Sequence, residues 1–181
     1  MTALSILFRV APAALLAAGV VACSPQKAAE APASSGASGD VITELTAADI
    51  PEGARAAVLA AVPGMTIKEA QRKARENRVY FDIEGNRPDG SEVELDVLEK
   101  DGKFEVVEIQ RDIAWADAPA SVKAVAEASG KSIAPVRVIE SAQPDGTIIY
   151  ELFAEGKPAK PSLEVRLKDG KADVLTEEWP H

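Results

Sequence analysis

Hydrophobic and polar residues alternate along several short stretches of this chain. Val79, Phe81 and Ile83 are separated by more polar neighbours, and residues 92–97 have the same period. A period of two residues predicts β-strands with one buried face. The Asp-Gly pairs at 101–102 and 169–170 predict tight hairpins, because both central residues of a type I′ turn need positive φ. The pattern therefore predicts an antiparallel sheet.

Two alanine-rich segments, residues 54–62 and 121–128, have a helical period instead. In the first, Val58 and Val62 are four residues apart, so they share one helix face. Pro51 and Pro119 precede the two segments, where a first helical turn does not need the missing N–H. Each segment predicts a helix with one apolar face.

The chain also contains an internal repeat. The sequence Lys-Asp-Gly-Lys at 100–103 returns at 168–171, and at the same spacing Leu95 and Val97 return as Leu163 and Val165. The repeat predicts an α+β fold of two tandem units, residues 41–113 and 114–181. In each unit one helix packs on one face of a four-stranded antiparallel sheet and the other face is wet. Such a unit is marginal alone, so we expect the two to pack together or to share a continuous sheet.

Residues 68–78 give conflicting signals. Their composition favours a helix by propensity, whereas the matching part of the second repeat, residues 136–140, is rich in β-branched residues. Tertiary context overrides propensity, and the repeat predicts a charged edge strand here.

The segment 51–62, the strands around Tyr80 and Tyr150, and the Asp-Gly hairpins that end both repeats resemble the PepSY-like domain family. The tandem arrangement is also similar to that of the secreted β-lactamase-inhibitor protein, whose sheet grips a loop of an enzyme. The resemblance implies that the chain binds or restrains another protein. The family pattern supplies no catalytic residues.

The N-terminal segment has the features of a lipoprotein signal peptide. An apolar run from Val10 to Ala22 ends at Cys23, and Val20 to Cys23 resembles a bacterial lipobox. The run is too short to span a bilayer as a helix. We expect residues 1–22 to be the signal peptide and residues 23–40 to be a disordered tether carrying acyl chains such as palmitate on Cys23. Secretion without lipid and a retained membrane anchor are the alternatives.

The residue after Cys23 indicates in which membrane we expect the lipid anchor. It is Ser24, and not the aspartate that retains many Gram-negative lipoproteins at the inner membrane. The expected location is the periplasmic face of the outer membrane, where the tether would present the folded part to envelope proteins.

The net charge of the chain and its content of histidine and cysteine limit the classes of function that remain. The chain has 29 acidic and 20 basic residues and a net charge of −9, which disfavours nucleic acid as a partner. Its one histidine is the terminal His181, and its one cysteine is Cys23, so histidine-based triads and metal sites are excluded. No cofactor is expected, and a hydrolase using paired carboxylates is the remaining catalytic alternative. We expect a protein that is not an enzyme.

Acidic residues occupy the polar positions of the predicted strands. This face offers a binding surface for a basic partner or for calcium, while a merely solvated face is the simpler interpretation. No EF-hand spacing is present, so no metal site is assigned. The candidate partner-binding residues are Asp82, Glu84, Glu92, Glu94, Asp96 and Glu164.

Two functions follow from these expectations. The first is a lipid-anchored binding module that inhibits or regulates an envelope enzyme. The second is an accessory lipoprotein in cell-envelope or outer-membrane assembly. The sequence leaves the partner and the oligomeric state open.

The lipid anchor generates the first testable prediction. Cys23→Ser removes the acylated thiol, and with it about 0.8 kcal/mol of membrane affinity for each buried methylene. We expect this variant to move from the membrane fraction to the soluble fraction of lysed cells, while Ser24→Ala stays with the membranes. Unchanged fractionation of Cys23→Ser contradicts a lipid anchor at this residue.

Overall fold

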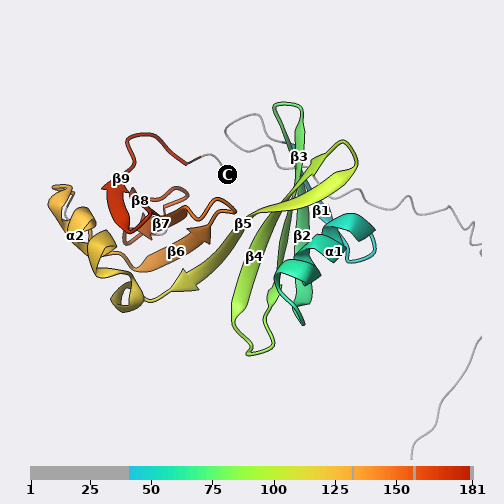
Figure 1. Ribbon diagram of the computed structural model, residues 1–181, viewed down its shortest axis with the longest axis horizontal. Helices are drawn as coiled ribbons and strands as arrows, with labels where there is room; N and C mark the ends of the chain where they lie inside the picture. Colours follow the sequence, from blue (N-terminus) through green and yellow to red (C-terminus); the bar gives the residue numbers. More distant parts are fainter. Residues whose placement is uncertain (1–40, 132, 157, 180–181) are drawn as a thin grey trace, which may run out of the picture. The chain divides into compact units, whose positions relative to one another are not determined.

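The computed structural model describes residues 41–131, 133–156 and 158–179 (Figure 1). The predicted signal peptide, Cys23, the predicted tether and His181 lie outside the described residues. In chain order the elements are β1 (Val41–Leu45), α1 (Glu52–Ala61), β2 (Thr66–Arg75), β3 (Arg78–Asn86), β4 (Glu92–Lys100), β5 (Lys103–Ile113), the 3-10 helix η1 (Trp115–Asp117), α2 (Ala120–Ala128), β6 (Arg137–Ala142), β7 (Ile148–Phe153), β8 (Leu163–Lys168) and β9 (Lys171–Val174). No helix among these elements is long and apolar enough to cross a bilayer.

The described strands form one antiparallel sheet of nine strands, in which each strand pairs with the next along the chain (Figure 1). The predicted fold class, two repeats of one helix on a four-stranded sheet, is therefore wrong. Strands β5 and β6 pair from Ile109 opposite Ala142 to Ile113 opposite Val138, so the ladder continues across the expected boundary. Continuation satisfies the backbone groups that two separate sheets would leave unpaired at their edges.

The additional strand is β1, which the sequence pattern does not reveal. It pairs with β2 from Val41 opposite Ala74 to Leu45 opposite Ala70. The segment 68–78 does contain a strand, β2, despite its helical propensity. It is not an edge strand, because β1 covers it on one side and β3 on the other.

Both helices pack on the same face of the sheet. Val58 of α1 is fully buried in a cluster that reaches Ile109 of β5, and Val122 of α2 is fully buried in a second cluster that reaches Ile113. Ile109 and Ile113 are four residues apart on one regularly paired strand, so they point to the same face. Helix α1 contacts β4 and β5, whereas α2 contacts β8 and β9.

Helix α1 lies very close to the sheet at Gly53. A Cβ atom there would come within 2.3 Å of the Phe104 ring on β5. Glycine thus lets α1 approach the sheet. The opposite face of the sheet carries no helix in the described part of the chain, and the polar residues of the strands collect there.

The continuous sheet predicts that the two halves unfold together. Val58→Ala removes two buried methyl groups beneath α1 and should cost about 2 kcal/mol. Both tryptophans, Trp115 and Trp179, lie beyond β5. If the sheet unfolds as one unit, Val58→Ala lowers the urea midpoint seen by tryptophan fluorescence as much as the midpoint seen by circular dichroism.

The control for this experiment is Leu59→Ala, because the Leu59 side chain is exposed on the same helix. It should change either midpoint little. An unshifted fluorescence transition in Val58→Ala would show that the halves unfold independently.

Candidate functional site

Two rows of carboxylates cross the face of the sheet that lies away from the helices. In the inner row Asp82 lies opposite Asp96, and Asp96 opposite Glu108, on β3, β4 and β5. In the outer row Glu69 lies opposite Glu84, and Glu84 opposite Glu94, on β2, β3 and β4. Like charges at directly opposed positions are destabilising, so this arrangement needs a compensating interaction.

The inner row is buried. Asp82 is 5% exposed, and Asp96 and Glu108 are 3% exposed. Lys73 on β2 forms an ion pair with one oxygen of Asp82, and the Ser141 hydroxyl on β6 donates a hydrogen bond to Glu108. Asp82 and Asp96 thus lie opposite each other, and the ammonium group of Lys73 pairs with Asp82. Burial of charge without full pairing strongly favours the neutral, protonated form.

The pKa values of the group follow from this burial. Burial raises the pKa of Asp96 well above its ordinary value, and the charges of Asp82 and Glu108 raise it further. The pKa of Asp82 is also raised by burial, although Lys73 and a hydrogen bond with Asp96 oppose the shift. Burial, followed by Asp82 and Glu84, raises the pKa of Glu94 to about 7. Glu94 therefore titrates near neutral pH, and the pKa values of Asp82 and Asp96 shift in the same direction.

Two opposing effects set the pKa of Lys73. Burial alone lowers the pKa of the ammonium group, but the charges of Asp82, Asp96 and Glu94 together with a hydrogen bond to Asp82 outweigh it, and the pKa is raised. Lys73 therefore stays charged and offsets one of the carboxylates.

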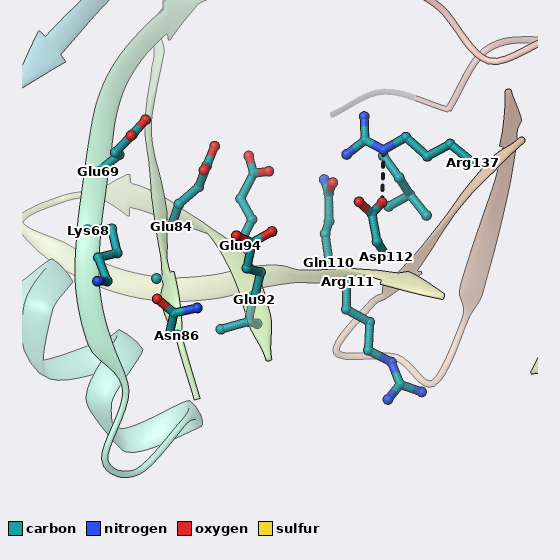
Figure 2. Close-up of a pocket in the computed structure, with 13 residues that line it drawn as sticks. Lys68, Glu69, Glu84, Asn86, Glu92, Glu94, Gln110, Arg111, Asp112 and Arg137 are labelled. Atoms are coloured by element: carbon teal, nitrogen blue, oxygen red, sulfur yellow. Dashed lines mark hydrogen bonds and ion pairs between the residues drawn. The ribbon is translucent and has the colours of Figure 1, made fainter. Parts of the chain in front are cut away.

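The outer row borders a groove of about 360 Å³ between β2 and β6. Figure 2 shows Glu69, Glu84, Glu94 and Gln110 side by side on successive strands, with their side chains extending in the same direction. Burial, followed by Glu69 and Glu92, raises the pKa of Glu84. The groove has the chemistry of a site for positively charged groups.

The arginines along the groove already have acidic partners. Arg137 bonds Asp112 at 2.9 Å, the dashed line in Figure 2, and Arg111 bonds Glu140 at 2.6 Å. No ion pair links Glu69, Glu84 or Glu92 to another residue in the described part of the chain. These carboxylates remain available to a ligand.

Three carboxylates also meet the spatial requirement for metal ligands. Asp82, Glu94 and Asp96 each offer one oxygen, and these oxygens all lie within 4.8 Å of one another. No other group of this kind occurs among residues 41–131, 133–156 and 158–179.

Five of the six candidate residues from the sequence lie together. Asp82 and Glu84 on β3 and Glu92, Glu94 and Asp96 on β4 share the face away from the helices. The expectation that this face is solvated holds for Glu84 and Glu92, but Asp82 and Asp96 are buried.

The sixth candidate, Glu164, lies on β8, with β5, β6 and β7 between it and β4. It is opposite Glu151 and is 7% exposed. The backbone N–H of Trp179 donates a hydrogen bond to its Oε2 at 2.9 Å. The C-terminal segment therefore contacts Glu164, which does not belong to the groove.

Sequence reasoning missed Lys73, Glu69 and Glu108. The first two belong to β2, whose alternation would have identified their face once β2 was taken as a strand. Glu108 could not be placed, because β5 contains a bulge between the pairs Asp96–Glu108 and Val97–Val106. Strict alternation would put Glu108 on the face of Phe104. The bulge shifts the phase and brings Glu108 opposite Asp96.

No protein-family model matches the chain, and no curated protein matches it in sequence. The resemblance to PepSY-like domains accordingly stays a prediction from short motifs.

The acidic group predicts an unusual dependence of stability on pH. Glu94 has a pKa of about 7 in the folded chain and an ordinary value of 4.5, so the folded state binds its proton more tightly. The free energy of unfolding should therefore fall as the pH rises from about 4.5 through 7, by about 3 kcal/mol from Glu94 alone. Asp82 and Asp96 shift in the same direction.

Urea unfolding at intervals between pH 4.5 and 8 measures this dependence. Glu94→Gln should flatten it, whereas Glu99→Gln, on the same strand but the opposite face, should leave it unchanged. Stability that rises over this interval in the unmodified chain contradicts the account.

Proposed function

We propose that the chain is a lipid-anchored periplasmic protein that binds a basic segment of another envelope protein and thereby inhibits or regulates it. The observation that carries the proposal is the outer row beside the groove. Its carboxylates have no ion-pair partners in the described part of the chain, while the neighbouring arginines are already paired. A lysine or arginine side chain is the ligand that matches this chemistry.

The depth of the groove supports a side chain rather than a flat contact. A volume of about 360 Å³ is at the lower end of the range for ligand pockets, and it is enough for one or two long side chains. Arg137 stands at one side of the groove, paired with Asp112, and restricts how a basic segment can lie. The net charge of −9 accelerates the encounter with such a partner.

Binding fits the inner row better than catalysis does. A general acid or base must reach the proton that it transfers, at hydrogen-bond distance from the substrate. Asp82 and Asp96 are almost fully buried. Glu94, which belongs to both the buried group and the groove lining, is the carboxylate of the group that a cation in the groove can reach.

Photo-crosslinking in the source cells tests the proposal. A photoreactive residue in place of Glu84 should capture a specific envelope protein, whereas the same residue in place of Glu99 on the opposite face should not. A regulated enzyme as the captured protein supports this function, and a component of outer-membrane assembly supports the accessory role instead.

The purified complex gives the quantitative test. Glu84→Lys should weaken binding about tenfold or more, and Glu99→Lys, with the same change in net charge, should leave the affinity unchanged. Raising the salt concentration from 0.1 to 0.5 M should also weaken the complex. Equal affinities of the two variants would exclude the groove as the binding site.

A further inference from the structure

Two buried oxygens of the inner row lack a donor. Oδ1 of Asp82 and Oδ1 of Asp96 are inaccessible to solvent, and no N–H or O–H group of the described residues donates to either. Both residues are more than nine-tenths buried. Ionised carboxylates are acceptors only, so two that face each other can be satisfied by a proton held between them or by a cation.

Three carboxylates, those of Asp82, Glu94 and Asp96, act on the ammonium group of Lys73. Lys73 binds Oδ2 of Asp82 and leaves Oδ1 free of that contact. An additional positive charge would therefore reduce the repulsion among these carboxylates, whose positions are set by the pairing of the strands.

The geometry suits a hard cation. The three oxygens from Asp82, Glu94 and Asp96 lie within 4.8 Å of one another. Calcium–oxygen bonds are about 2.3–2.6 Å, so two ligands of one Ca²⁺ can be about 5 Å apart, whereas Mg²⁺ requires ligands within about 4.2 Å. An all-carboxylate set without nitrogen or sulfur favours such ions over zinc or copper.

The groove supplies the route to this position. Glu94 lines the groove and is the least buried of the three ligands, so an ion can reach Asp82 and Asp96 past its carboxylate. Water in the groove can complete the coordination shell, which three protein ligands alone do not fill.

We propose that Asp82, Glu94 and Asp96 form a binding site for a hard divalent cation, best matched by Ca²⁺, whose ligands include the buried oxygens that lack a donor. The ion would connect β3 to β4 at the base of the groove. This site shares Glu94 with the groove proposed above for a protein partner, but it needs no second protein, so its test on the purified chain is separate.

Calorimetry and thermal unfolding of the purified full chain, treated with EDTA, test the site. At pH 7.5, Ca²⁺ should bind with one ion per chain, and 2 mM Ca²⁺ should raise the Tm by about 4 °C. Affinity should fall about tenfold or more between pH 7.5 and 5.5, because protons compete for the same oxygens. Mg²⁺ at the same concentration should give a smaller shift.

Asp96→Asn and Glu94→Gln distinguish the site from general screening of charge. Each variant removes one ligand and one source of repulsion, so we expect both variants to fold. In the absence of Ca²⁺ each should be more stable than the unmodified chain. Neither should show the rise in Tm that Ca²⁺ produces in the unmodified chain. Glu99→Gln should keep the full shift. The proposal is overturned if Ca²⁺ produces no heat and no shift, if both ligand variants retain the shift, or if NaCl of equal ionic strength reproduces it.

Discussion

The side chains of nine paired strands alternate between two faces, and in the described chain both helices occupy only one of them. This constraint determines much of the rest. The covered face is mainly apolar, so most acidic residues of β3 and β4 lie on the other face. Antiparallel register then sets which of these residues meet. In β3, β4 and β5 it brings carboxylates directly opposite one another, and the acidic site follows from the same pairing that holds the sheet together.

Local elements of this fold could be predicted from the sequence, and their assembly could not. Alternation identified the central strands, and the valine spacing identified both helices. The repeat correctly overrode the helical propensity of β2. Repetition says nothing about whether two units share backbone hydrogen bonds, however, and β1 is too short and too exposed to show a period. The sequence therefore left two arrangements open, units packed together or one continuous sheet, and the ninth strand was missed.

The acidic site, too, could be predicted from the sequence only where it depends on local pattern. Period and composition placed Asp82, Glu84, Glu92, Glu94 and Asp96 on one face, because these positions depend only on local alternation. The contribution of Glu108 depends on a one-residue bulge, and that of Lys73 depends on β2 lying beside β3. Burial also depends on the assembled sheet. A row that looked solvated in sequence is enclosed in the fold, and burial raises the pKa of Asp82 and Asp96.

The ion pair between Lys73 and Asp82 has a consequence for how strongly this face can bind anything. Lys73 is already a ligand of the acidic group, held permanently at high local concentration by the strand that carries it. An external cation or a basic side chain meets carboxylates whose charge is partly neutralised, and this limits its affinity. For the cation or basic segment proposed above, Lys73 is a competitor built into the same sheet, and its removal is expected to strengthen binding.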